Sequence, residues 1–197
     1  MSDYADIRFD PSVVLSRGTI EADSAFRVAP EVPSAVNPEA FKAAMRVLAG
    51  GVVMVTARKG DRLWGLTISA CCSISATPPQ VLISLAETAS CLPAIRETGH
   101  FGLSILRAGQ RSLAELGAVP GGRKEVDAFC QTPNGDTTMT AGALAHLDCA
   151  VERTFLVSDH TLIVGTVEHA VTGEDLEDPG PLLYFNRSFH ALGEQIQ

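Results

Sequence analysis

The sequence GLTISACCSISATPP at residues 65–79, which QVLISL at residues 80–85 follows at once, decides how this chain folds. The first stretch is rich in serine and threonine and contains no charged residue. Thr77-Pro78-Pro79 ends its pattern, and the run from Val81 to Leu85 then predicts a strand buried on both faces. Short hydrogen-bond donors and open backbone N–H groups thus lie between two strand-like segments. Such a surface suits a flat ligand with polar edges.

The segments around this stretch predict further short elements. Upstream, Asn37 and Pro38 begin a predicted helix that packs by one apolar face, which carries Phe41, Ala44, Met45 and Leu48, and Gly50-Gly51 ends it. Residues 52–57 and 63–67 predict a hairpin. The elements predicted after residue 85 are a helix that the Ser90 hydroxyl caps and that ends at Gly99, a strand at 101–106, a helix at 110–116, a long loop at 117–142, strands at 144–157 and 161–171, and a strand at 182–189.

The order of these elements predicts the fold class. About six or seven strands follow one another by hairpins rather than alternating with long helices. This pattern indicates a mainly β protein, an antiparallel barrel with peripheral helices, formed by one domain at residues 37–197. Prolines interrupt residues 1–36, which are predicted to be an N-terminal extension, either an arm packed on a neighbouring subunit or a loose segment.

Composition excludes several classes of function. The formal net charge of -8 disfavours binding to nucleic acid or to an anionic membrane surface. No apolar run reaches the roughly 20 residues of a membrane helix, and the acidic N-terminus does not have the layout of a signal peptide. The five cysteines are odd in number and lack C-x-x-C spacing, so we expect a cytoplasmic protein without disulfides and without a bound metal.

Motif searches leave few candidates for chemistry. The chain contains neither the G-x-G-x-x-G of a dinucleotide fold nor the G-x-S-x-G of a serine hydrolase. His146 and Cys149 are predicted to face opposite sides of a strand, which disfavours a metal site, and Cys71 and Cys72 are interpreted as structural thiols. A helix that opens at Ser90 predicts an anion site, and the Asp159-His160 pair in a hairpin turn is a further candidate.

Five motifs in order resemble the signature of the short-chain flavin reductases. They are the helix and strand at residues 41–56, GLTISA at 65–70 with SISATPP at 73–79, GHFGLSIL at 99–106, SDH at 158–160 and PLLY at 181–184. The resemblance covers residues 38–192. It implies an FMN-binding split barrel that forms a homodimer and reduces FMN or FAD with NADH or NADPH. It also implies that the reduced flavin diffuses to a separate monooxygenase component.

The resemblance assigns roles to particular residues. His160 matches the family histidine near the nicotinamide and is the expected catalytic residue. Hydride passes from the nicotinamide to the flavin, so no protein acid or base is strictly required. The expected flavin-binding residues are Leu63, Trp64, Gly65, Leu66 and Thr67 along the ring, Ser69 and Ala70 at its polar edge, Ser84, Leu85 and Ala86 at the end of the next strand, and Ser90 and Cys91 at the phosphate.

Three residues depart from the family pattern. Ala70 replaces a usual serine, Ser158 replaces a usual glycine, and Thr88 stands where a polar or basic residue often helps with the phosphate. The preference between FMN and FAD therefore stays open. The preference between NADH and NADPH also stays open, because no acid or arginine that would read the ribose is visible in the sequence. Two other hypotheses remain: a flavin-binding carrier or sensor without reductase activity, and a barrel that acts only in complex with an oxygenase.

Overall fold

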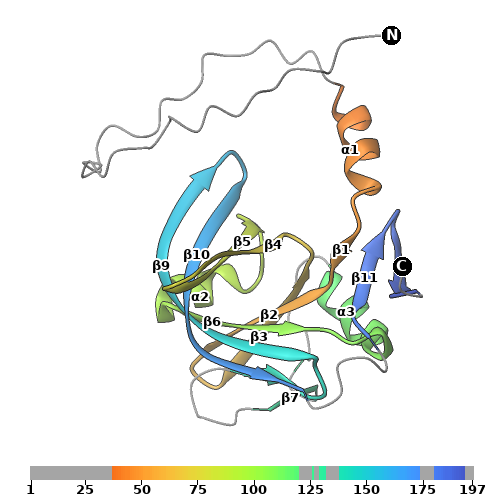
Figure 1. Ribbon diagram of the computed structural model, residues 1–197. Coiled ribbons are helices and arrows are strands. Elements are labelled where there is room, and N and C mark those ends of the chain that lie inside the picture. Colours follow the sequence, from red (N-terminus) through yellow and green to blue (C-terminus); the bar gives the residue numbers. More distant parts are fainter. Residues whose placement is uncertain (1–36, 120–125, 127–128, 132–137, 174–179, 194–197) are drawn as a thin grey trace, which may run out of the picture. The chain divides into compact units, whose positions relative to one another are not determined.

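The computed structural model describes residues 37–119, 126, 129–131, 138–173 and 180–193 (Figure 1). The chain divides into two units, Met1–Pro38 and Glu39–Gln197, and the predicted extension at residues 1–36 lies outside the described residues. The helices among the described residues are α1 (Pro38–Arg46), α2 (Leu92–Thr98) and α3 (Arg111–Ala118), with a short 3-10 helix, η1 (Ala108–Gln110). None of them has the length and apolarity to span a membrane.

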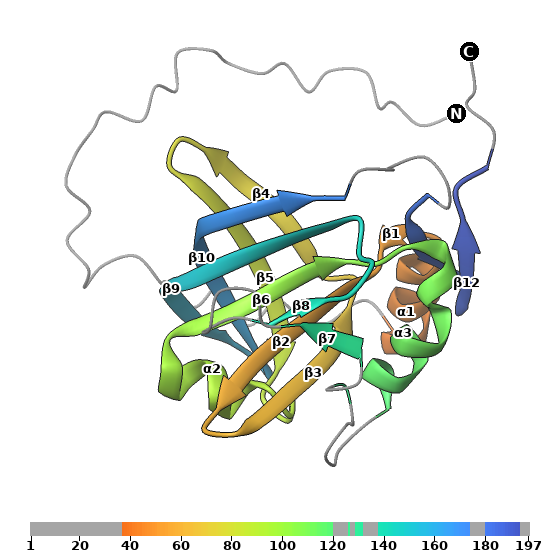
Figure 2. The ribbon, with the colours of Figure 1, turned by 90° about the horizontal axis from the view of Figure 1, so that it is seen from below.

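An antiparallel sheet of seven strands dominates the second unit (Figure 2). Its order is β3-β2-β6-β9-β10-β5-β4. The bounds are β2 (Val53–Lys59), β3 (Arg62–Ile68), β4 (Cys71–Ala76), β5 (Pro79–Ala86), β6 (His100–Ile105), β9 (Ala145–Val157) and β10 (His160–Thr172). The smaller sheets contain β1 (Gly50–Gly51), β11 (Leu182–Phe185) and β12 (Ser188–Ala191) in one, and β7 (Cys130–Gln131) and β8 (Met139–Thr140) in the other. The prediction of a mainly β, antiparallel protein with peripheral helices is confirmed.

Alternation along β3 divides the buried residues into two clusters. Leu66 packs against one cluster, which includes Val55, Ile83 and Phe101. Leu63 belongs to the other cluster on the opposite face. Successive side chains of a strand point to opposite sides, so one strand supplies both clusters. α2 packs against β2 and β6, and α3 packs against β3.

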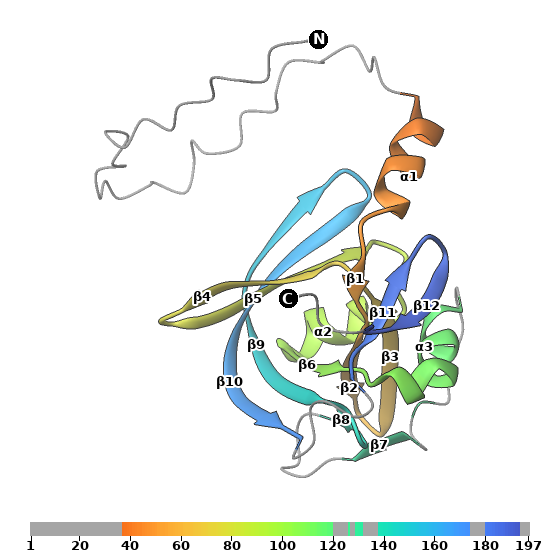
Figure 3. The ribbon, with the colours of Figure 1, turned by 45° about the vertical axis from the view of Figure 1, so that its right-hand side comes forward.

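The long hairpin of β9 and β10 curves along the sheet (Figure 3). Its tip carries exposed apolar side chains, including Leu156 and Val157. Ser158 in the turn has a φ of 56°, a left-handed conformation that is unfavourable for residues other than glycine. His160 lies at the first position of β10, next to this turn.

Several predicted elements differ from those observed. The apolar face of α1 is exposed in this chain, with Phe41 at 58% and Met45 at 47%, so the described residues do not supply the predicted packing. Gly50-Gly51 pairs with β11 rather than merely ending the helix. The single strand predicted at 182–189 is a hairpin, because Asn186 and Arg187 both have positive φ and form a two-residue turn.

Two further segments were predicted too simply. Residues 117–142 were expected to form a loop, but they include the end of α3 and the strands β7 and β8. β5 was expected to be buried on both faces. Instead Val81, Ile83 and Leu85 are buried, whereas Leu82, Ser84 and Ala86 are only half-buried. The half-buried face is the one that a ligand can reach.

Candidate functional site

A cavity of about 450 Å³ lies where β3 faces the ends of β5 and β10. We call it the main cavity. Its volume falls within the usual range of small-molecule sites. Among the described residues, the lining contains no permanent charge, and its one titratable side chain is that of His160. The lining residues are Leu66, Ile68, Ser84, Leu85, Ala86, Thr88, Ala89, Ser90, Ala118, Val119 and His160.

Strand register and a close helix contact bring this lining together. β5 and β10 pair so that Ala86 lies opposite His160. Leu66 and Ile68 share one face of β3, because residues two apart in a strand point the same way. The end of α3 approaches β3 closely at Gly117, where a Cβ atom would overlap with the Thr67 hydroxyl. A glycine at this position therefore lets Ala118 and Val119 reach the cavity.

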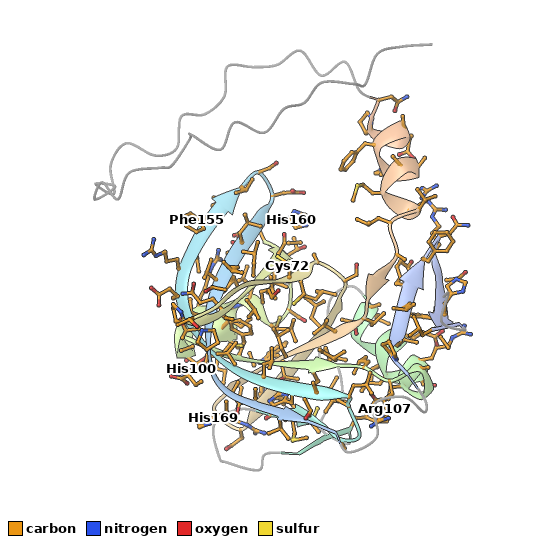
Figure 4. All side chains as sticks on the ribbon, in the orientation of Figure 1. Cys72, His100, Arg107, Phe155, His160 and His169 are labelled. Atoms are coloured by element: carbon orange, nitrogen blue, oxygen red, sulfur yellow. The ribbon has the colours of Figure 1, made fainter. Side chains whose placement is uncertain are left out.

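His160 is held by its neighbour in the turn. Its Nδ1 lies 2.8 Å from Oδ1 of Asp159, and 46% of its side chain is exposed. This hydrogen bond lowers the pKa of the Asp159 carboxyl. The Asp159 carbonyl also accepts the Glu87 N–H at 2.9 Å, which ties the turn to the end of β5. Figure 4 shows His160 near the hairpin turn, far along the hairpin from His169.

A polar network next to the turn was not predicted. Arg96 of α2 donates to the Glu87 carboxylate at 2.8 Å and contacts the Thr161 hydroxyl at 3.0 Å. The Thr161 hydroxyl also donates to Glu87. These hydrogen bonds lower the pKa of Glu87, with the Thr161 bond as the larger cause. The network joins α2 to the strand that carries His160, across separations in sequence that no local motif reveals.

The structure places the predicted flavin-binding residues in three groups. Six of them line the main cavity: Leu66, Ser84, Leu85, Ala86, Ser90 and His160. Two, Thr67 and Ser69, line a space of about 460 Å³ that we call the aromatic cavity, together with Tyr184, Arg187 and Phe189. The two cavities adjoin, since Ile68, Ala118 and Val119 line both. Trp64 lines a third space of about 460 Å³, the basic cavity, with Lys59, Arg62, Ser90, Pro93 and Ala94.

The remaining predicted residues lie away from these linings. Leu63 and Gly65 face the opposite side of β3, where a Cβ atom on Gly65 would meet Val126. Ala70 lies between β3 and β4, and its carbonyl accepts the Ser84 N–H at 3.1 Å. Cys91 is fully buried and is the N-cap residue of α2, without a side-chain cap hydrogen bond. The prediction that Ser90 caps this helix is therefore wrong by one residue.

Cys71 and Cys149 behave as structural thiols, whereas Cys72, which was also interpreted as structural, is exposed. Burial raises the pKa of Cys71 to about 11 and that of Cys149 to about 12, so both stay protonated near neutral pH. All five cysteines are free. His146 and Cys149 face opposite sides of β9, as predicted, because His146 bonds Asp148 whereas Cys149 packs with Phe101. No group of three potential metal ligands occurs within the described part of the chain.

Comparisons with known proteins give a consistent set of relatives. The family model of the flavin reductase like domain matches residues 45–193. The reductase component of 4-hydroxyphenylacetate 3-monooxygenase from Thermus thermophilus is 38% identical over 154 residues, which are 78% of this chain and 96% of that protein. The flavin reductase (NADH) of Kitasatospora aureofaciens is 33% identical over 160 residues, which are 80% of this chain and 83% of that protein.

A solved structure extends this likeness to three dimensions. The NADH:FAD oxidoreductase SgcE6 of Streptomyces globisporus C-1027, in complex with NAD and FAD fragments, matches with a TM-score of 0.73 and 25% sequence identity. The match covers 82% of this chain and 98% of that one. The strands that line the main cavity thus belong to an arrangement that a solved oxidoreductase shares.

Proposed function

Because the chain belongs to the flavin reductase like family, as its motifs predicted, we propose that it is an NAD(P)H:flavin oxidoreductase that reduces FMN or FAD. The observation that carries this proposal is the main cavity. It gathers six of the residues that the resemblance assigns to flavin binding, from three separate strands and a loop. The described residues of its lining carry no permanent charge, which suits a site that positions a redox ring rather than one that supplies an acid and a base.

The residues of the main cavity fit a flavin. Leu66 and Ile68 offer an apolar wall to a flat ring, and Ser84 and Ser90 offer hydroxyl groups to its polar atoms. A bound flavin supplies the ring that accepts a hydride from the nicotinamide. The protein's part is to hold the two rings in contact. We assign the positioning of the nicotinamide to His160, the first residue of β10.

We further propose that the reduced flavin serves a separate monooxygenase. The relative from Thermus thermophilus is named as the reductase component of such an enzyme, which supports this assignment. We also propose a homodimer of split barrels in the cytoplasm. The exposed apolar faces of α1 and of the β9–β10 tip support the dimer, and the five free cysteines support a reducing compartment.

Initial rates of NADH and NADPH oxidation test this function. We expect oxidation only when FMN, FAD or riboflavin is supplied, and we expect the rate to saturate with flavin concentration. A matched measurement without flavin gives the background. Oxidation that does not depend on flavin would overturn the proposal.

Anaerobic titration separates the alternative function. A reductase bleaches the absorbance of its oxidised flavin when NADH is added without oxygen. A carrier or sensor retains the oxidised flavin and shows no bleaching. Repeating the assay with an added oxygenase component tests the third hypothesis, under which turnover occurs only in the complex.

A further inference from the structure

We propose that the basic cavity binds the adenosine diphosphate part of FAD, so that this chain prefers FAD to FMN. The inference rests on the proposed function, because it requires a flavin in the main cavity. It begins from a shared residue: Ser90 lines both the main cavity and the basic cavity. The resemblance places the flavin phosphate at Ser90. FMN ends at this phosphate, whereas FAD continues from it with a second phosphate and an adenosine.

The charge of the basic cavity suits these phosphates. Lys59 and Arg62 lie opposite each other in the backbone register, at the turn end of the β2–β3 hairpin. No acidic side chain lines this space in the described part of the chain. Lys59 forms an ion pair with Glu97 of α2. Arg62 takes part in no ion pair among the residues with described positions. Since a guanidinium binds phosphate oxygens through two parallel hydrogen bonds, Arg62 is the cation available to a diphosphate.

Trp64 gives the basic cavity a wall for the base. It lies on the same face of β3 as Leu66, which lines the main cavity. Two residues along a strand span roughly 7 Å, so Leu66 and Arg62 are about 13 Å apart along the strand, with Trp64 between them. Flat bases stack on indole rings, and such stacking requires no particular sequence or hydrogen-bond partner. One strand face therefore offers an apolar site, an aromatic site and a cationic site in succession.

The main and basic cavities differ in a way that supports this division. Of the residues with described positions, those that line the main cavity carry no permanent charge, whereas those that line the basic cavity include two cations in a chain of net charge -8. An uncharged isoalloxazine ring and a charged diphosphate require these two environments. The nicotinamide cosubstrate also contains adenosine diphosphate. Because Ser90 lines both cavities, the adenosine diphosphate bound in the basic cavity is assigned to the flavin. The experiment below distinguishes the flavin from the nicotinamide cosubstrate.

Binding measurements on the full chain test the inference without turnover. We expect calorimetric titration to show that FAD binds about tenfold more tightly than FMN. Arg62→Gln and Trp64→Leu are each expected to weaken FAD binding about tenfold, and to change FMN binding less than about twofold. Trp64→Phe should keep FAD binding within about threefold of the parent. Arg111→Gln, which alters an exposed cation of α3 outside all three cavities, is the matched control.

A second readout uses ADP alone. Trp64 is the only tryptophan of the chain, so its emission reports directly on the basic cavity. We expect ADP to change this emission in the parent chain, and Arg62→Gln to raise the ADP concentration required about tenfold. Circular dichroism of each variant confirms that it is folded.

Three outcomes would overturn the inference. The first is equal affinity of the parent for FAD and FMN, and the second is FAD binding that neither variant weakens. If flavin-dependent NADH oxidation is still observed, either result rules out the adenosine site but not the proposed function. A rise in the KM for NADH with FMN as the flavin, without any change in FAD affinity, would assign the cavity to the nicotinamide cosubstrate instead. By contrast, failure of every flavin to bind or to be reduced would overturn the proposed function itself.

Discussion

Two histidines of this chain are hydrogen-bonded to carboxylates, and they differ in access. His146 lies inside the molecule, 5% exposed, with Nδ1 2.9 Å from the Ser104 hydroxyl and Nε2 2.7 Å from the Asp148 carboxylate. His160 lies at the start of β10 beside Asp159, with nearly half of its side chain exposed to the main cavity and solvent. The first group has the residue types of a hydrolase triad, and the second has a single histidine.

Access explains why the richer group is the structural one. Ser104 is fully buried, and its oxygen accepts the Thr140 N–H at 2.9 Å. None of the three residues lines the main, aromatic or basic cavity. The nearby Thr56 hydroxyl donates to the Thr138 carbonyl at 2.6 Å, so this network fastens the segment around β8 to the sheet. A catalytic set of residue types therefore indicates catalysis only where a substrate can reach it.

Replacing His146 should give the largest effect, and the effect should be on stability. His146→Ala removes the imidazole that bonds both the Ser104 hydroxyl and the Asp148 carboxylate, and it creates a cavity. We expect a loss of about 3 kcal/mol in the free energy of unfolding. Urea unfolding followed by circular dichroism measures it. His169→Ala, on the exposed part of β10, is the control and should change stability by less than about 0.5 kcal/mol.

The same variant tests the division between the two histidines. Folded His146→Ala should bind flavin with nearly the parent affinity. A loss of stability below about 1 kcal/mol, or a loss of flavin affinity in the folded variant, would show that the buried group contributes to the flavin site rather than to stability.

Replacing His160 should affect activity rather than stability, the opposite of the result expected for His146. His160→Ala is expected to lower kcat/KM for NADH about tenfold, equivalent to roughly 1.4 kcal/mol of transition-state stabilisation, while flavin affinity stays within about twofold. Stability should change little, because the side chain is half exposed. Steady-state kinetics over a range of NADH concentrations, with calorimetric flavin binding, measures both. Parent-like kinetics would leave His160 as a turn residue only.

The sequence predicted what depends on local pattern. The family resemblance placed Leu66 beside the flavin ring and pointed to Ser84, Ser90 and His160, and these four residues line one cavity. Periodicity also identified the apolar face of α1, but it cannot say what covers such a face. The N-cap of α2 was predicted at Ser90 and is observed at Cys91, because residue type determines helix ends only weakly.

The missed features depend on contacts between distant segments. Arg96 meets Thr161 across 65 positions, and Ser104 meets His146 across 42. Ala118 and Val119 reach the main cavity only because α3 crosses β3 closely at Gly117. No spacing rule connects such residues. Trp64 was expected beside the flavin ring, and the structure instead places it in the neighbouring basic cavity, a position that strand alternation alone does not distinguish.

The network beside His160 should give a smaller effect that depends on pH. Hydrogen bonds from Thr161 and Arg96 lower the pKa of Glu87 below its ordinary value of 4.5. A carboxyl whose folded pKa is lowered stabilises the fold above its unfolded pKa, and this contribution disappears as the pH falls through the folded pKa. The difference in Tm between the parent and Glu87→Gln should therefore be largest near pH 7 and should close in acid below pH 4.5.

Thermal unfolding at several pH values checks this sign. Glu39→Gln, on exposed α1, is the control for general acid effects. A gap between parent and Glu87→Gln that stays constant from pH 7 into acid would mean that packing, rather than the charge of Glu87, stabilises this region.

The smallest effect is expected at Ser158, where the functional turn carries strain that the buried network lacks. Its φ of 56° costs a side-chain residue about 1–2 kcal/mol, and glycine removes this cost at an entropic penalty of roughly 0.5–1 kcal/mol. Ser158→Gly should therefore raise stability by about 0.5–1 kcal/mol in urea unfolding. We expect kcat/KM for NADH to change less than about twofold, because Asp159 still bonds both His160 and the Glu87 N–H. A larger loss of NADH use, with stability gained, would mean that the strained serine itself fixes the position of His160, and the turn would then be tuned for function at the expense of stability.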